Sequence, residues 1–403
     1  MKIGVISHYY NSKNYGGNLQ AYALIKYINE RGYQSEQISC SLWWRPKLFS
    51  QSFWRQGMIR KMKDVVRKVL DSLYNFKHWC QTPYKAEERR VTRRKAKIAT
   101  FNQQCIPHSS EVYYRHDYLR MKDHYDVFIT GSDQVWNNQW GGFFPAFFLD
   151  GIEAPKVKLS YAASMGKHEW SQEELQKFKS SLADYLAISV REEEAADILK
   201  NAVSNQVEWV VDPTLLLNKE DWNKICTERL VQEPYLFCYF LGDDPEERKL
   251  ATEYASKHGL KVATIPFLAD AWRYDKSASE REVTFGDVKL YEAGVEDFLS
   301  LIKHATCVFT DSFHAALFSG VFQREYFIFG RGEMNSRITS LTKLYETEER
   351  FCNTPEKRTM EYIQAQRSID YTRDLKFLEE MRQKSKDFLC TNLEKAERQI
   401  NGI

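Results

Sequence analysis

The residues that could do chemistry gather first near position 310, where a predicted strand passes directly into a predicted helix. The run reads Thr310-Asp311-Ser312-Phe313-His314. Free backbone N–H groups and the helix dipole favour an anion at such a helix N-terminus. Ser312 could donate to a phosphate or carboxylate, and His314 could move a proton. A helix cap at Asp311 or Ser312, followed by a structural histidine, fits the same spacing.

Arg191 is the second candidate, in the run Ser189-Val-Arg-Glu-Glu-Glu194 at another strand end. Three acids in the first turn of a helix complement its dipole, whereas a cation there is unfavourable. An arginine in this place suggests a bound carboxylate or phosphate, held by two parallel hydrogen bonds. An ion pair with a nearby acid remains the alternative.

The loop after the first predicted strand is the third candidate. It reads Tyr15-Gly16-Gly17-Asn18-Leu19-Gln20, and its two glycines would let the backbone approach a ligand closely. The run lacks the G-x-G-x-x-G and Walker patterns, so it predicts neither a dinucleotide site nor a P-loop. A plain turn between a strand and a helix fits as well.

Two further runs could contact ligands. Residues 131–137 contain Asp133, Gln134, Trp136 and Asn137, which could bind the hydroxyls and the apolar face of a sugar, although Asp133 could also only be a cap. Arg337, after a predicted strand at 326–329, is a second candidate anion clamp. Metal-protease, serine-hydrolase and EF-hand motifs are absent, so we expect neither a metal nor a cofactor.

These residues need a scaffold of alternating strands and helices. Apolar periodicity predicts strands at 2–9, 37–40, 126–130, 157–162, 185–190 and 207–211, with a helix at 19–30 that Asn18 could cap. After a polar linker at 218–232 the pattern restarts, and it ends in a charged helix at 373–400. We therefore expect two doubly wound α/β domains, with ligands at strand ends and in the cleft between domains.

The expected boundaries are an N-terminal domain at 1–222, with a basic, aromatic-rich insertion at 43–100, a second domain at 223–365 and a C-terminal helical extension at 366–403. The chain has 403 residues, 43% hydrophobic and 28% charged, which is ordinary globular usage. That length and composition suggest about two domains and exclude a disordered chain.

The net charge of +2 conceals an uneven distribution. Residues 45–97 hold sixteen lysines and arginines against four acids, so this segment carries +12 and the rest of the chain −10. Its tryptophans and phenylalanines fit an amphipathic helix on an anionic membrane surface. Neutralising Arg89, Arg90, Arg93 and Arg94 would then weaken membrane association. Nucleic-acid binding and a solvated helical insertion are the alternatives.

The chain carries no signature of export. No apolar run approaches the ~18 residues of a membrane span, and the N-terminus does not resemble a signal peptide. The eight cysteines are scattered, without C-x-x-C pairs, which favours neither a zinc site nor a disulfide framework. We expect a cytoplasmic protein that could lie peripherally on the inner face of the cytoplasmic membrane.

Taken in order, the polar runs resemble the polysaccharide pyruvyl transferase family. The matching motifs are Tyr15-Gly-Gly-Asn-Leu-Gln-Ala-Tyr-Ala-Leu24, Thr130-Gly-Ser-Asp-Gln-Val-Trp-Asn137, Tyr161-Ala-Ala-Ser-Met-Gly166, Ser189-Val-Arg-Glu192, Asp212-Pro-Thr-Leu215, Thr310-Asp-Ser-Phe-His-Ala315 and Asn335-Ser-Arg337. Each motif is weak alone, but the ordered series is specific. It leaves out the basic insertion and the C-terminal helix.

The resemblance implies two Rossmann-like domains in a glycosyltransferase-B-like arrangement. It also implies transfer of a pyruvyl group from phosphoenolpyruvate to two hydroxyls of a hexose, which gives a pyruvate ketal and phosphate. The acceptor would belong to a bacterial surface polysaccharide precursor, often lipid-linked, and the inner membrane surface would be met through 43–100. Phosphoenolpyruvate is the donor substrate, and neither a cofactor nor nucleic acid is expected.

Site residues carry over by position. His314 matches the catalytic histidine of the family and Arg191 its donor-binding arginine. The further donor residues expected are Asp311, Ser312, Phe313, Arg337, Gly16 and Gly17. The acceptor residues expected are Asn18, Gln20, Asp133, Gln134, Trp136 and Asn137.

One departure concerns the donor site. Members of the family often have Arg-Leu-His where this chain has Ser312-Phe313-His314, so a donor-clamping arginine is missing at Ser312. Arg337 could replace it. A nucleotide-sugar glycosyltransferase on the same scaffold and a non-catalytic membrane-binding module are the two alternative functions.

Overall fold

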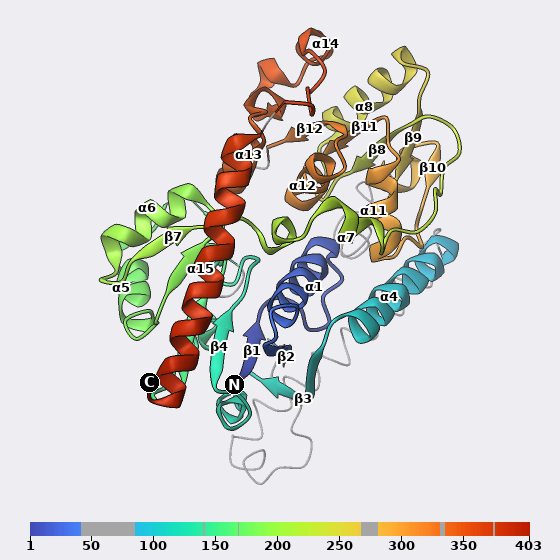
Figure 1. The fold of residues 1–403 in the computed structure, drawn as a ribbon. Helices are drawn as coiled ribbons and strands as arrows, with labels where there is room; N and C mark the ends of the chain where they lie inside the picture. Colours follow the sequence, from blue (N-terminus) through green and yellow to red (C-terminus); the bar gives the residue numbers. More distant parts are fainter. Residues whose placement is uncertain (42–84, 140–141, 168, 267–280, 331–334, 374) are drawn as a thin grey trace, which may run out of the picture.

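The structure is a computed structural model that describes residues 1–41, 85–139, 142–167, 169–266, 281–330, 335–373 and 375–403 (Figure 1). The expected basic insertion falls mainly on residues 42–84, so most of it lies outside the described residues. Its C-terminal end is the long helix α4 (Lys85–Cys105).

The N-terminal domain contains a parallel sheet in the order β3-β2-β1-β4-β5. These strands are β1 (Lys2–Ile6), β2 (Gln34–Ser41), β3 (His108–Tyr114), β4 (Val127–Thr130) and β5 (Val157–Ser160). A parallel pair, β6 (Ile188–Val190) and β7 (Val207–Trp209), continues the sheet through single bridges from Leu159 to Ala187 and from Ala163 to Val190. The helices are α1 (Tyr15–Asn29), α4, α5 (Gln172–Ser181) and α6 (Glu193–Ala202).

The C-terminal domain repeats this plan. After the short helix α7 (Lys219–Asn223), the parallel sheet has the order β10-β9-β8-β11-β12-β13. The strands are β8 (Tyr235–Tyr239), β9 (Lys261–Thr264), β10 (Val288–Lys289), β11 (Cys307–Thr310), β12 (Glu325–Phe329) and β13 (Phe351–Cys352). The helices are α8 (Pro245–Lys257), α11 (Val295–Lys303), α12 (Phe313–Val321), α13 (Ser336–Tyr345) and α14 (Met360–Ala365). Two doubly wound α/β domains are thus confirmed.

Helix α1 begins four residues before the predicted start at 19. Asn14, and not Asn18, is its cap, because the Asn14 side chain accepts a hydrogen bond from the backbone N–H of Gly17 at 3.3 Å. Asn18 is fully buried inside the helix. The two glycines that suggested an open loop therefore form the first turn of α1.

Helix α4 joins the two domains rather than standing free. Arg94 is 7% exposed and donates to the backbone oxygen of Pro266 at 2.8 Å. Arg90 and Arg93 pair with Glu292 at 3.3 and 3.0 Å. The interpretation of Arg94 as a membrane-facing residue is therefore wrong, because its guanidinium is committed to the neighbouring domain.

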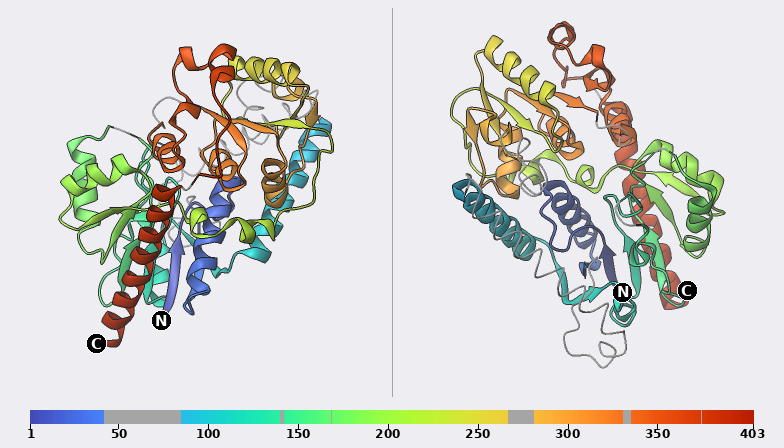
Figure 2. Two further views of the ribbon diagram at one scale, coloured as in Figure 1. Left: turned by 45° about the horizontal axis from the view of Figure 1, so that its top comes forward. Right: turned by 180° about the vertical axis from the view of Figure 1, so that it is seen from behind.

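The C-terminal helix α15 (Lys376–Asn401) leaves the second domain and packs along the first, so that the two chain ends lie near one another in every view (Figures 1 and 2). Arg382 donates to the backbone oxygen of Leu215 at 2.8 Å, and Ser385 accepts from the N–H of Val211 at 2.8 Å. Its apolar face, including Leu389 and Leu393, joins a core cluster that contains residues of both domains. None of the helices in the described part of the chain has the length and hydropathy of a membrane span.

Candidate active site

Polar side chains from three strand ends of the N-terminal domain meet the first turns of α12 and α13. Asp133 follows β4, Arg191 follows β6 and Asp212 follows β7. His314 comes from the second residue of α12. The carboxyl ends of parallel strands share one edge of a sheet, which is why motifs far apart in the sequence converge here.

Arg191 lies at the centre of this cluster, with its side chain 1% exposed. Its Nη1 donates to Oδ2 of Asp212 at 2.9 Å, and its Nε lies 3.4 Å from Oε1 of Glu192. Nη2 lies 3.6 Å from Asp133 and has no hydrogen-bond partner among the described residues. The ring of Phe313 stacks against the guanidinium, with 4.8 Å between Cζ and the ring centroid. The ion-pair alternative raised by the sequence is thus present, and Nη2 is the donor that remains.

The charges of this cluster reinforce one another. Burial alone would lower the pKa of Arg191, but the carboxylates of Asp212, Glu192 and Asp133 raise it above its usual value. Burial alone would raise the pKa of Asp212, but His314 and Arg191 outweigh it and hold that pKa below its usual range. Asp212 therefore remains ionised within the protein interior.

His314 crosses the domain boundary. The residue is 7% exposed, and its Nε2 lies 3.6 Å from Oδ2 of Asp212. The other edge of the ring faces Gly16, where a Cβ would lie 1.9 Å from Nδ1. Any residue other than glycine at position 16 would therefore displace the imidazole. Gly16 thus allows the backbone of α1 to approach the His314 ring of the other domain closely.

Asp133 has the left-handed backbone conformation, with φ of 77°. Its Oδ1 accepts from the N–H of Gln134 at 2.9 Å, so the carboxylate fixes a tight turn and does not cap a helix. Although burial opposes the change, Arg191, His8, His314 and Arg337 together lower the pKa of Asp133. Asp133 is thus an ionised carboxylate close to the histidine.

The expected acceptor residues separate into two groups. Gln134 and Asn137 are half-buried, and the Asn137 amide donates to Oε1 of Gln134 at 2.7 Å. Trp136 is fully buried, and its Nε1 donates to the backbone oxygen of Phe147. Its predicted contact with a sugar is therefore wrong, because the ring belongs to the hydrophobic core.

Asn18 and Gln20 are likewise fully buried in α1. Gln20 donates to the backbone oxygen of Gly17 at 2.7 Å and to Oγ of Ser7 at 3.3 Å. Asn18 donates to the backbone oxygen of Ser12 at 3.4 Å, so both side chains bond within or next to the first turn of α1. They do not reach the surface where an acceptor would lie, so their predicted contact with the acceptor is also wrong.

The expected donor residues also differ in position. Both carboxylate oxygens of Asp311 accept backbone N–H groups, from Leu241 and Gly242 at 2.6 Å each, so Asp311 anchors the loop after β8. Ser312 is the N-cap residue of α12 but makes no side-chain cap bond. Arg337 is half-buried in the first turn of α13, where its charge helps to lower the pKa of Asp133.

Sequence reasoning did not assign Asp212, Glu192, Ser132 and His8 to the site. In the sequence, Asp212 appears only within the motif Asp212-Pro-Thr-Leu215, without a site role, and Glu192 as one of three acids that complement a helix dipole. Burial raises the pKa of Glu192 against the opposing effect of Arg191. The signal that could have found three of them is position: Asp212 directly follows the predicted strand 207–211, and Ser132 and Glu192 are the second residues after the strands predicted at 126–130 and 185–190. His8 lies inside the strand predicted at 2–9, which ends at Ile6 in the structure.

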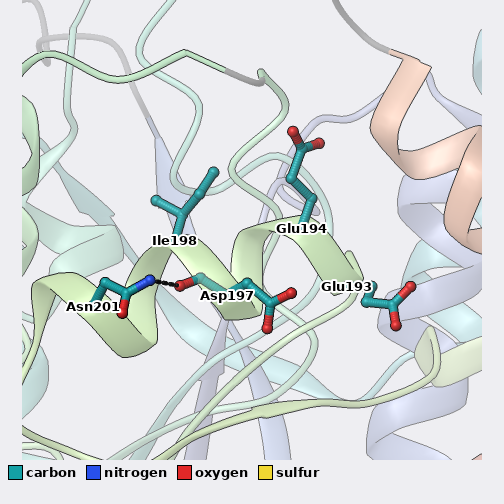
Figure 3. Close-up of a pocket in the computed structure, with 5 residues that line it drawn as sticks. All are labelled: Glu193, Glu194, Asp197, Ile198 and Asn201. Atoms are coloured by element: carbon teal, nitrogen blue, oxygen red, sulfur yellow. Dashed lines mark hydrogen bonds between the residues drawn. The ribbon is translucent and has the colours of Figure 1, made fainter.

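A separate hollow lies on the outer face of α6, with a volume of about 380 Å³ (Figure 3). Its lining residues are Glu193, Glu194, Asp197, Ile198 and Asn201. The Glu193 carboxylate pairs with Lys343 of α13 at 2.6 Å, and no group of metal-ligating side chains was found among the described residues. Carboxylates repel anions, so the lining of this hollow does not suit an anionic ligand.

Comparison with known proteins identifies the sequence pattern. A family model described as polysaccharide pyruvyl transferase matches residues 14–331. A comparison with curated proteins finds no match.

Solved structures show the fold. A protein described as a UDP-N-acetylglucosamine 2-epimerase from Listeria monocytogenes is 10% identical, with a TM-score of 0.51, over 100% of this chain and 97% of that chain. The UDP-GlcNAc 2-epimerase from Methanocaldococcus jannaschii is 10% identical, with a TM-score of 0.50, over 93% and 94% of the two chains. At such identity the likeness concerns architecture alone, which is a glycosyltransferase-B-like pair of Rossmann-like domains.

Proposed function

The chain belongs to the polysaccharide pyruvyl transferase family, and on that premise we propose that it transfers a pyruvyl group from phosphoenolpyruvate to two hydroxyls of a hexose. The product is a pyruvate ketal on a bacterial surface polysaccharide precursor, with release of phosphate. The observation that carries the proposal is the cluster of His314, Arg191 and Asp212. Three separate family motifs supply these residues, and the fold brings them within hydrogen-bond or ion-pair distance.

The reaction needs one group that both gives and takes a proton. His314, as an imidazolium, gives a proton to the vinyl carbon C3 of phosphoenolpyruvate, and C2 becomes electrophilic. The first sugar hydroxyl attacks C2 and returns its proton to His314. The second hydroxyl then attacks C2 as the C–O bond to phosphate breaks, and its proton leaves with the phosphate. Two hydroxyl protons thus end on the new methyl group and on phosphate.

The donor carries a carboxylate and a phosphate, so it needs positive charge from more than one source. Nη2 of Arg191 offers one hydrogen bond, because its other nitrogens face Asp212 and Glu192. The free N–H groups of the first turn of α12 and the side chain of Arg337 supply the rest. Arg337, in the first turn of α13, thus takes the place of the arginine that is missing at position 312. Gln134 and Asn137 are the acceptor-facing residues of the proposal.

A lipid-linked acceptor would bring the enzyme to the inner membrane surface. We propose that residues 43–100 make this contact. The exposed Arg89 of α4 remains available for it, whereas Arg94 does not.

The test is incubation of the purified full chain with phosphoenolpyruvate and a panel of lipid-linked galactose and mannose acceptors. Mass spectrometry should detect a pyruvate ketal on one acceptor, with an equal amount of phosphate released. Parallel reactions with nucleotide sugars should yield no glycosylated product. Transfer from a nucleotide sugar, without transfer from phosphoenolpyruvate, would support a glycosyltransferase and overturn the proposal.

A further inference from the structure

The two ring nitrogens of His314 face different groups, and both groups belong to the other domain. Nε2 lies 3.6 Å from the Asp212 carboxylate, which follows β7. Nδ1 lies against the first turn of α1, where Gly16 has no side chain. The imidazole on α12 is therefore placed by the N-terminal domain.

We propose that Asp212 is the positioning residue of His314: its carboxylate accepts a hydrogen bond from the Nε2–H group, which leaves Nδ1, beside Gly16, to exchange protons with the substrates. This inference rests on the proposed function in so far as His314 is the proton-transfer group. It adds which nitrogen reacts and which residue selects it.

Asp212 is built for this task. Its Oδ1 accepts from the N–H and the Oγ1 of Thr214, at 3.0 and 2.7 Å, and its Oδ2 accepts from Arg191. These bonds fix the plane of a carboxylate that is 2% exposed. An ionised carboxylate can only accept hydrogen bonds, so it favours the histidine tautomer with the proton on Nε2. A separation of 3.6 Å is long, as is common for catalytic pairs before substrate binds.

The proposal keeps the proton balance. The proton on Nε2 stays there throughout and is hydrogen-bonded to Asp212. Nδ1 gives its proton to C3 and then accepts one from the first hydroxyl. The charge on the imidazolium is balanced by Asp212 at each stage. Because residue 16 is glycine, it has no side chain at Nδ1, where an added Cβ would lie 1.9 Å away.

The test uses the full chain with nitrogen-15 in its histidines, and it does not require turnover. The chain has nine histidines, so the signal of His314 is assigned with His314→Gln. At a pH where the ring is neutral, the wild-type protein should show the tautomer protonated at Nε2. Asp212→Asn should lose this preference, and its transfer rate should fall about 10²-fold. The Thr214 hydroxyl contacts only Oδ1 of Asp212, so Thr214→Val should keep the tautomer protonated at Nε2.

A second pair of variants guards against misfolding of Asp212→Asn. Gly16→Ala favours the helix by about 1 kcal/mol, yet its Cβ would collide with Nδ1 and move the ring away from Asp212. At Gly17 the nearest atom to an added Cβ is Oδ2 of Asp133, at 3.2 Å, so Gly17→Ala should leave the tautomer of His314 unchanged. The proposal is supported if His314 loses its preference for the Nε2-protonated tautomer in Gly16→Ala but keeps it in Gly17→Ala.

Two results would overturn it: a wild-type His314 protonated at Nδ1, or an unchanged tautomer in both Asp212→Asn and Gly16→Ala. The proposed function fails separately. If phosphoenolpyruvate gives no ketal while His314 shows the expected tautomer, the donor is wrong and the positioning by Asp212 stands.

Discussion

At the residue scale, the site is organised around one buried arginine that three carboxylates surround. Arg191 holds the strand-end loops together, and its Nη2 has no hydrogen-bond partner among the described residues, so we propose that this nitrogen binds the donor. An arginine suits both roles, because its fixed fork of donors can serve several acceptors at once. The sequence raised ligand binding and ion pairing as alternatives, and the geometry accommodates both.

Residue identities predicted part of this site. His314 and Arg191 lie in one cluster, as expected from two strand–helix junctions. The prediction for Trp136 was wrong because an aromatic residue among polar residues is typical of a sugar-binding site. In the structure its indole contacts Phe147 and Phe148 of the short 3-10 helix Pro145–Phe148. Asp212 was overlooked because its partners, Arg191 and His314, are distant in sequence. Hydrophobic periodicity reports local secondary structure, so it cannot reveal a contact between residues that are distant in sequence.

Glu247 of α8 provides a residue-scale prediction about pH. Burial, with Asp311 and Asp244 nearby, raises the pKa of Glu247 to about 8, against roughly 4.3 in an unfolded chain. Between these values the folded state binds a proton that the unfolded state has lost, so stability falls as the pH rises towards about 8. Glu247→Gln should remove this slope and exceed the wild-type stability by about 1–3 kcal/mol above that pH.

Urea unfolding at several pH values measures the effect of Glu247→Gln. The exposed neighbour Glu246 supplies the control, because Glu246→Gln should follow the wild-type curve. Parallel curves for the wild-type protein and Glu247→Gln would contradict the assignment of a shifted carboxyl in α8.

At the element scale, sequence periodicity located six strands of the N-terminal domain, β1, β2 and β4 to β7, and the C-terminal helix α15 to within three residues, but it did not predict β3. The predicted start of α1 was wrong, because two adjacent glycines are typical of a loop. The hydrogen bond from the N–H of Gly17 to the Asn14 side chain marks the true start of the helix. The charge count also treated the basic segment as a surface unit. In the described part, α4, Arg94 instead donates to the backbone oxygen of Pro266 and Lys97 pairs with Asp297, and both partners belong to the other domain. A charge count cannot distinguish a solvated arginine from one that bonds a neighbouring domain.

Helix α4 therefore yields a prediction about domain contact. Arg94→Met keeps the aliphatic stem but leaves the Pro266 oxygen without its donor, which should cost about 1–3 kcal/mol. Amides of α4 should then exchange faster with deuterated solvent. Arg89→Met, at an exposed position of the same helix, should change stability by no more than about 0.5 kcal/mol. Equal exchange in the two variants would show that α4 does not join the domains.

At the scale of the whole molecule, two elements tie the domains together on different sides. Helix α4 reaches from the first domain to α11, and α15 returns from the second domain along the first. The sequence predicted α15 as a charged extension, because its polar face dominates the composition. Its buried residues Leu389, Leu393 and Ala396 show that it belongs to the core cluster that contains residues of both domains. The site between the domains thus depends on both elements.

Truncation of one side chain in α15 should therefore weaken the whole fold. Leu393 is fully buried, and Leu393→Ala should lower the free energy of unfolding by about 2–5 kcal/mol. The matched control is Lys395→Ala, at an exposed position two residues further on. Thermal and denaturant unfolding measure both variants. A loss below about 1 kcal/mol for Leu393→Ala would mean that α15 is not part of the core.

The account as a whole depends on one reaction at one site. The most direct measurement follows carbon-labelled phosphoenolpyruvate into a lipid-linked hexose acceptor, with the wild-type protein and His314→Ala in parallel. We predict that the label enters the acceptor as a ketal in the wild-type reaction and that the rate falls by about 10²-fold or more in His314→Ala. Label transfer at the wild-type rate in His314→Ala, or its absence with every acceptor while a nucleotide sugar is consumed, would contradict the account.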